Sequence, residues 1–183
     1  GNAETLSQWA ATLDLPSDKT TFFNFLASHD GIGLMPTRGI LPEDEVAAIA
    51  KRVEALGGFV SYKNNPDGSQ SPYELNINYL DALGNPNVEE TFDLRAKRFL
   101  ASQAIMLALR GVPGIYFHSL FGSQGWLDGV AQTGRNRTIN REKLQKVTIE
   151  QELADPQSLR SLVLQPYLHM LSVRAAQPAF HPN

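Results

Sequence analysis

Apolar residues recur at helical spacing in five stretches of the chain, and this pattern predicts five helices. These helices cover residues 3–13, 42–56, 88–109, 148–154 and 157–176. Pro42 begins the second helix, and three acidic residues follow it, where the helix dipole favours negative charge. The third helix is apolar nearly all round in its second half, which is typical of a buried helix. Pro166 lies inside the apolar stripe of the last helix, so we expect a kink or break there.

Two short runs are apolar on both faces, as in the buried strands of parallel sheets. The first covers residues 20–27 and the second covers residues 114–120. Residues 73–83 fit either a strand or a helix, and residues 31–41 and 121–142 are predicted to be loops. Strands that alternate with helices predict an α/β fold with parallel strands. Because a complete (β/α)8 TIM barrel needs eight strands and about 250 residues, we expect this chain to be part of a larger barrel.

The composition excludes several classes of protein. The 183 residues are 42% apolar and 19% charged, which excludes a disordered tail, a collagen and a coiled coil. Without cysteine there is neither a disulfide nor a thiolate metal site. The net charge of −3 and the absence of a basic patch argue against a nucleic-acid partner. No apolar run is long enough for a membrane helix and the first residues do not resemble a signal peptide, so we expect one domain in a cytoplasmic protein.

A histidine and an aspartate, His29 and Asp30, directly follow the first predicted strand. Reactive groups of β/α folds gather at the carboxyl ends of strands. A carboxylate beside a histidine can bind adjacent sugar hydroxyls and stabilise a cationic transition state. Alternatively, Asp30 caps a turn and His29 is only a polar residue at the end of a strand.

Three arginines lie within seven residues of the predicted loop that follows the second strand. Arg135, Arg137 and Arg141 have no acidic residue between them, which favours binding of a phosphate or carboxylate. The alternative is a solvated loop in which one arginine pairs with Glu142. A second polar stretch, residues 63–74, has the donors and acceptors of a carbohydrate site, although the turn sequence "NPDG" explains half of it without any function.

The remaining histidines show no spacing typical of a metal site, and we expect neither a metal nor a cofactor. His118 lies inside the second predicted strand, where a hydrogen-bonded core histidine is the simpler interpretation. His169 lies on a helix and His181 near the end of the chain. Trp126 could stack on a sugar ring or could anchor its loop.

Four stretches together resemble the sucrose phosphorylase subgroup of the α-amylase superfamily. "FFNFLASHDGIG" resembles the region of strand seven in that superfamily, and "GVPGIYFHSLFGS" resembles the start of strand eight. "GRNRTINRE" and "SPYELNINYLDAL" narrow the match to the subgroup, in which such segments line the acceptor and phosphate subsites. The resemblance covers nearly the whole chain.

The resemblance implies a (β/α)8 barrel, of which residues 1–183 would form strands seven and eight with helices six to eight. The N-terminal barrel strands and a C-terminal β domain would be absent. The reaction would be the reversible phosphorolysis of an α-glucoside with retention, in which inorganic phosphate gives α-glucose 1-phosphate. Such a reaction needs a carboxylate nucleophile and a carboxylic acid/base about 5 Å apart, which in this family lie on strands four and five. We therefore expect this chain to need the remainder of its barrel and to be inactive alone.

The resemblance also assigns roles to individual residues. Asp30 matches the carboxylate that stabilises the transition state, and His29 matches its partner on the sugar hydroxyls. The substrate-binding residues would be Tyr73, Glu74, Arg135, Arg137, Asn140 and Arg141. Glu74 stands where the sucrose enzymes carry glutamine, which argues against sucrose itself. The segments "YKNNPDGSQSPYE" and "GRNRTINRE" most resemble the glucosylglycerate type, and fructose, glycerate and glycerol all stay open as acceptors. The extra arginine suits an anionic acceptor such as glycerate.

Two other functions fit the same residues. A hydrolase of α-glucosides would admit water where phosphate would otherwise bind. A non-catalytic carbohydrate-binding or scaffold protein would keep His29 and Asp30 without needing the other carboxylates. Buried strands with open edges also favour intermolecular pairing, so a homo-oligomer is possible.

Overall fold

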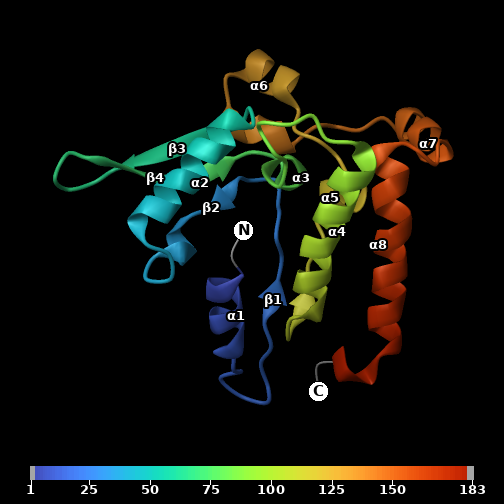
Figure 1. Ribbon diagram of the computed structural model, residues 1–183, viewed down its shortest axis with the longest axis horizontal. Helices are drawn as coiled ribbons and strands as arrows, with labels where there is room; N and C mark the ends of the chain where they lie inside the picture. The colour runs from blue at the N-terminus through green and yellow to red at the C-terminus, as the bar shows by residue number, and fades with distance from the viewer. Residues whose placement is uncertain (1–2, 181–183) are drawn as a thin grey trace.

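The computed structural model describes residues 3–180, and Figure 1 shows the order of its elements along the chain. The helices are α1 (Glu4–Ala11), α2 (Glu43–Ala55), α3 (Tyr79–Ala82), α4 (Phe92–Ala108), α5 (Phe117–Leu120), α6 (Leu127–Thr133), α7 (Lys146–Ala154) and α8 (Leu159–Ala176). Short 3-10 helices cover Met35–Thr37, Asn136–Asn140 and Pro178–Phe180. The strands are β1 (Phe23–Asn24), β2 (Ile32–Gly33), β3 (Phe59–Asn64), β4 (Gln70–Asn76) and β5 (Val112–Pro113).

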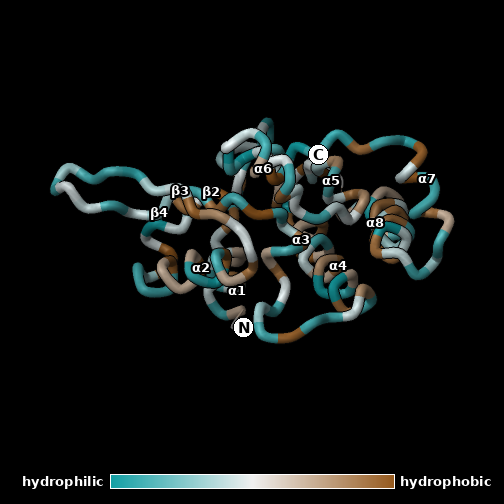
Figure 2. Tube along the Cα trace, turned by 90° about the horizontal axis from the view of Figure 1, so that it is seen from above, coloured by the Kyte–Doolittle hydropathy of each residue, from teal (hydrophilic) through white to brown (hydrophobic). Residues whose placement is uncertain are grey.

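The strands form two small sheets. β1 pairs with β5 in parallel, with Phe23 opposite Val112. β2, β4 and β3 form an antiparallel sheet in that order, in which Gly33 lies opposite Glu74. Figure 1 shows this antiparallel sheet and α2 on one side of the molecule, with α4 and α8 side by side on the other. The hydrophilic tip of the β3–β4 hairpin projects away from the helices (Figure 2).

Two apolar clusters hold these parts together. One lies where α4 packs against α8, and Phe99, Val163 and Tyr167 are fully buried in it. The other lies between α2 and the antiparallel sheet and comprises Leu34, Ala50, Val53, Leu75 and Ile77. The stretch from β4 to α3 connects the two clusters, because Leu75 and Ile77 belong to the second and Leu80 belongs to the first.

The helices predicted from periodicity are present, with differences at their ends. The third begins at Phe92, four residues later than predicted, because the Thr91 hydroxyl accepts a hydrogen bond from the Leu94 amide at 3.3 Å and so caps it. The last helix runs unbroken through Pro166. Residues 73–83 contain both a strand and a helix, the two elements that the pattern allowed, because β4 ends at Asn76 and α3 begins at Tyr79. The predicted loop over residues 121–142 contains α6 and a 3-10 helix.

The first predicted strand, residues 20–27, pairs in parallel as expected but is not buried. Only Phe23 and Asn24 are paired, and the side chains of Phe23 and Phe25 are 66% and 55% exposed. Within residues 3–180, β5 is the one strand that pairs with β1. Among the described residues, the face that carries Phe23 and Phe25 and the second edge of β1 therefore lack neighbours that would cover them, whereas Leu26 packs against the α4–α8 cluster.

The prediction of a second strand over residues 114–120 is wrong. The pairing occurs earlier, where the Val112 amide donates to the Phe22 carbonyl at 2.8 Å, and the chain then turns into α5. Gly111 makes this approach possible, because its φ of +133° is unfavourable for other residues and an added Cβ would lie 2.7 Å from the Phe22 carbonyl oxygen. His118 therefore lies on α5, not in a strand.

Within residues 3–180, every helix is too short or too polar to span a lipid bilayer.

The buried hydrogen bond between α4 and α8 gives a test of this packing. The Tyr167 hydroxyl donates to Gln103 Oε1 at 2.8 Å, and both side chains are almost completely buried. Tyr167→Phe should lower the free energy of unfolding by about 1–3 kcal/mol, because it leaves a buried acceptor without a donor. Urea unfolding measures this change, and Tyr62→Phe, on an exposed tyrosine of β3, is the control. Equal effects of the two substitutions would contradict the packing described.

Candidate active site

The segment that follows β1, up to residue 31, contacts the arginine-rich segment, residues 135–141. Asp30 Oδ1 accepts a hydrogen bond from Arg141 Nη2 at 2.7 Å, and Arg137 Nη1 lies 3.4 Å from the same oxygen. Charge-assisted hydrogen bonds of this kind are stronger than neutral ones. The Asp30 carboxylate is thus bound by guanidinium groups, and the interpretation of Asp30 as a simple turn cap does not account for these contacts.

The Glu74 carboxylate, on β4, is the most buried charge of the site. Its side chain is 6% exposed. Oε1 accepts from the Gly31 amide at 3.0 Å, and Oε2 accepts from Arg137 Nε at 3.1 Å. The hydrogen bond with Glu74 is the main reason why the pKa of Arg137 is raised. A buried carboxylate is costly unless it is paired. Glu74 is paired on both sides, and because its two partners are Gly31 and Arg137, it joins the segment after β1 to the arginine-rich segment.

Asn140 fixes the end of the same segment. Its side-chain Nδ2 donates to the Asp30 backbone carbonyl at 3.0 Å and to the Ile77 backbone carbonyl at 3.2 Å. The backbone carbonyl of Asn140 accepts from the Tyr116 hydroxyl at 2.5 Å. Arg141 Nε also donates to the His29 carbonyl at 3.0 Å. We call the group Asp30, Glu74, Arg137, Asn140 and Arg141 the carboxylate–arginine cluster.

His29 stands at the margin of this cluster. Its Nε2 lies 3.7 Å from Asp30 Oδ2, beyond hydrogen-bond distance, and its side chain is 65% exposed. The imidazole is therefore open to a ligand or to further polypeptide.

A hollow of about 790 Å³ opens beside the cluster. It is lined by polar side chains, among them Ser61, Tyr73, Glu74, Asn76, Arg135, Arg137 and Arg141. Among the described residues, Arg135 has no carboxylate within ion-pair distance, and the buried amide nitrogen of Asn76 has no acceptor. Three arginines face two carboxylates, Asp30 and Glu74, which leaves one positive charge. The hollow is suited to an anion that carries hydroxyl groups.

The structure brings all eight site residues predicted from the sequence together. Five of them form the cluster, Tyr73 and Arg135 line the hollow, and His29 lies beside Asp30. Within residues 3–180 no arginine pairs with Glu142, and Arg137 and Arg141 pair instead with Glu74 and Asp30, although all three arginines are exposed to solvent. Their roles toward a substrate stay predictions.

Other polar residues singled out in the sequence have structural partners. Asp67 accepts hydrogen bonds from both the amide and the hydroxyl of Ser69, which lowers its pKa, so it stabilises the hairpin turn. The Trp126 ring packs on Gly129, where an added Cβ would lie 2.2 Å from the indole. This contact supports its role as a loop anchor.

His118 is buried, and its Nδ1 lies 3.0 Å from the Ser123 hydroxyl. Burial lowers the pKa of this imidazole. The prediction of a hydrogen-bonded core histidine is confirmed, and only its position in a strand was wrong. His181 lies outside the described residues, and in the part that is described no three histidine or acidic side chains are close enough to hold a metal.

Two residues that support the site were missed. Tyr116 was assigned to a buried strand, where its hydroxyl had no predicted partner. Asp81 lies in the stretch that fitted either a strand or a helix, so the direction of its side chain could not be inferred. The structure shows that Tyr116 bonds Asn140 and that Asp81 bonds Gly125.

The double hydrogen bond of Asn140 gives a second test. Asn140→Ala removes the donor of two buried carbonyls and should lower the free energy of unfolding by about 1–3 kcal/mol. Urea unfolding measures the loss, and Gln132→Ala on the exposed face of α6 is the control. A loss no larger than that of the control would show that Asn140 does not hold the segment.

Known proteins resemble this chain over its whole length, although no protein-family model matches it. A glucosylglycerate phosphorylase from Spirochaeta thermophila is 52% identical over 97% of the chain, which spans 30% of that protein. A glucosylglycerate phosphorylase from Allomeiothermus silvanus is 51% identical over the entire chain, which spans 33% of that protein. The chain thus spans about a third of the length of these relatives.

A solved structure supports the fold. The crystal structure of sucrose 6F-phosphate phosphorylase from Thermoanaerobacter thermosaccharolyticum matches 97% of the chain with a TM-score of 0.76, at 23% identity and over 33% of its own length. The α/β fold described here is therefore the fold of a segment of that enzyme. The sequence matches show that the chain is homologous to glucosylglycerate phosphorylases, of which it corresponds to a segment about a third of their length.

Proposed function

We propose that residues 1–183 form part of the catalytic (β/α)8 barrel of a glucosylglycerate phosphorylase, with β1 and β5 as strands seven and eight. The relatives are about three times as long as this chain, which leaves polypeptide for the N-terminal strands and for a C-terminal β domain. The exposed phenylalanines of β1 support this proposal, because neighbouring parts of a barrel would cover them.

The observation that carries the proposal is the pairing of Asp30 with two arginines beside the polar hollow. In this assignment Asp30 binds the glucosyl hydroxyls and stabilises the oxocarbenium-like transition state, and His29 binds neighbouring hydroxyls. Asp30 and Glu74 are both hydrogen-bonded to arginine, and this assignment gives them binding and structural roles. The reactive pair of carboxylates would come from the remainder of the barrel.

The arginines of the hollow would bind the anions of the reaction. Arg137 and Arg141 would bind inorganic phosphate and the acceptor, together with Tyr73 and Asn140. Arg135 has no carboxylate partner among the described residues, so it is available for the carboxylate of glycerate. The two relatives that are 52% and 51% identical over the aligned residues are named for glucosylglycerate, whereas the sucrose 6F-phosphate phosphorylase from Thermoanaerobacter thermosaccharolyticum is 23% identical.

A chimera tests the proposal. Residues 1–183 replace the matched third of the Allomeiothermus silvanus relative, which aligns with the entire chain. The chimera should convert glucosylglycerate and phosphate to glucose 1-phosphate, measured as phosphate-dependent product formation, and residues 1–183 alone should not. Activity of residues 1–183 alone, or an inactive folded chimera, would contradict the proposal.

The role of Arg137 can be tested in the same chimera. Arg137→Ala removes a guanidinium that would bind phosphate, so the KM for phosphate should rise by about ten- to a hundredfold. Asp128→Ala, on the exposed face of α6, is the control. An unchanged dependence of the rate on phosphate would favour a hydrolase of α-glucosides.

The acceptor can be identified in the reverse reaction. With glucose 1-phosphate as donor, the chimera should use glycerate at least tenfold better than fructose or glycerol, judged by kcat/KM, since only glycerate offers a carboxylate to arginine. Arg135→Ala should reduce this preference. Equal use of the three acceptors would contradict an anionic acceptor site.

A further inference from the structure

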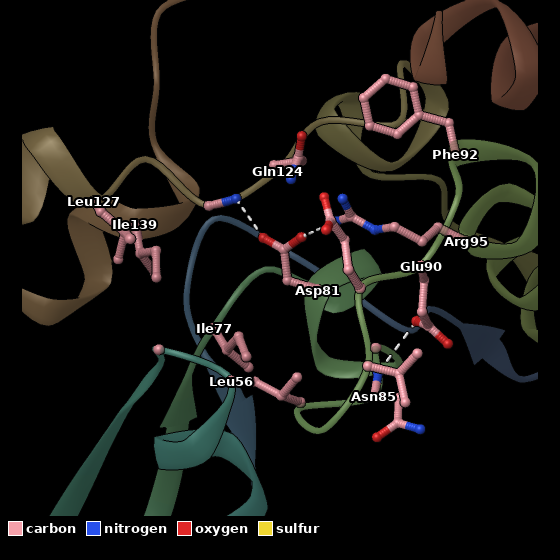
Figure 3. A pocket seen from close by; sticks show the side chains of 15 residues that line it. Leu56, Ile77, Asp81, Asn85, Glu90, Phe92, Arg95, Gln124, Leu127 and Ile139 are labelled. Atoms are coloured by element: carbon pink, nitrogen blue, oxygen red, sulfur yellow. Dashed lines mark hydrogen bonds and ion pairs between the residues drawn. The ribbon is translucent and has the colours of Figure 1, made fainter. Parts of the chain in front are cut away.

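The Asp81 carboxylate lies outside the hollow and binds two separate elements. Figure 3 shows it between a backbone amide of the segment that precedes α6 and the side chain of Arg95. Asp81 Oδ2 accepts from the Gly125 amide at 2.7 Å, and Oδ1 accepts from Arg95 Nη2 at 2.7 Å. The side chains of Asp81 and Arg95 are only 20% and 19% exposed. Such a shielded and doubly bonded carboxylate fixes the backbone that it contacts.

Gly125 connects Asp81 to the arginine-rich segment through its contact with Ile139. An added Cβ on Gly125 would lie 2.9 Å from Ile139 Cγ1, so the two residues are in close contact. The amide of the next residue, Trp126, donates to the Ile139 carbonyl at 2.9 Å. Ile139 is 2% exposed and lies two residues after Arg137. A displacement of Gly125 therefore moves the backbone that carries Arg137.

One short segment, residues 74–81, binds the stretch over residues 121–142 at two points. Glu74, on β4, holds the Arg137 side chain, and Asp81, on α3 seven residues later, holds Gly125. Asn78 caps α3 by accepting from the Leu80 amide at 2.9 Å, which fixes the direction of this short helix. The distance between the two anchoring points is thus set by the β4–α3 connection.

The pocket around Asp81 is not itself a suitable binding site. Its volume is about 450 Å³, and three of its four charged lining residues, Asp81, Glu90 and Arg95, are already in ion pairs. Arg95 binds Asp81, and Glu90 binds Arg98 at 2.5 Å. Asp81 therefore acts on the neighbouring hollow through Gly125.

We propose that Asp81 is a positioning residue that holds the Gly125 backbone and thereby aims Arg137 into the anion-binding hollow. This inference rests on the proposed function, because it assumes that the hollow binds phosphate. Asp81 touches no substrate in this assignment. Its loss should weaken phosphate binding and should leave the transfer of glucose to water nearly unchanged, since that reaction does not use Arg137.

The experiment uses the chimera with three substitutions of Asp81. Asp81→Ala removes the acceptor, Asp81→Leu removes it while keeping the volume, and Asp81→Asn keeps an acceptor oxygen for the Gly125 amide. Asp93→Ala is the matched control, because it removes an exposed carboxylate that pairs with Lys97 on α4. Thermal unfolding identifies the variants that fold, and Asp81→Leu decides the question if Asp81→Ala does not fold.

Two readouts separate positioning from a general loss of structure. Calorimetric titration with inorganic phosphate gives Kd, and kinetics give the KM for phosphate and the rate of glucose transfer to water. Asp81→Ala and Asp81→Leu should raise both Kd and KM by about tenfold with transfer to water within about twofold. Asp81→Asn should stay within about threefold of the unmodified chimera, as should Asp93→Ala.

Several results would overturn the inference. These are an unchanged phosphate affinity in the alanine and leucine variants, a parallel fall of both reactions, or an equally large loss in Asp81→Asn. A chimera that binds phosphate but does not form glucose 1-phosphate would refute the proposed function, while the change of Kd would still decide the role of Asp81. A chimera that binds no phosphate at all would contradict both.

Discussion

The site depends on a carboxylate that must be paired where it is buried. Glu74 is almost inaccessible to solvent, and the hydrogen bonds from the Gly31 amide and the Arg137 guanidinium offset the cost of burying its carboxylate. Gly31 has to be glycine, since an added Cβ would lie 2.5 Å from the Leu75 carbonyl oxygen. This close approach brings Asp30 to the arginines and joins three segments that are far apart in the sequence.

Capping residues and the spacing of apolar residues predict the five longest helices of the described chain, whereas α5 lies where a strand was predicted and α6 where a loop was predicted. The Thr91 and Ser158 hydroxyls cap α4 and α8, and apolar residues follow both caps at helical spacing. The strands were predicted less well because their burial depends on other segments. Residues 20–27 have the composition of a buried strand, yet their burial requires neighbours that residues 3–180 do not supply.

The candidate site could be located from residue types, whereas its contacts could not. An aspartate after a strand and a run of arginines suggested sugar and anion binding, and the family resemblance united them. The bonds of Glu74 to Gly31 and of Asp81 to Gly125 depend on the antiparallel pairing of β2 with β4 and on the short α3. Neither feature follows from periodicity, because the residues concerned lie in short or irregular elements.

In the proposed function, the carboxylate–arginine cluster binds both halves of glucose 1-phosphate. A crystal structure of the chimera with this ligand tests the claim most directly. The account predicts glucosyl hydroxyls within hydrogen-bond distance of Asp30 and phosphate oxygens within hydrogen-bond distance of Arg137. A ligand bound in the barrel with neither residue in contact would contradict it.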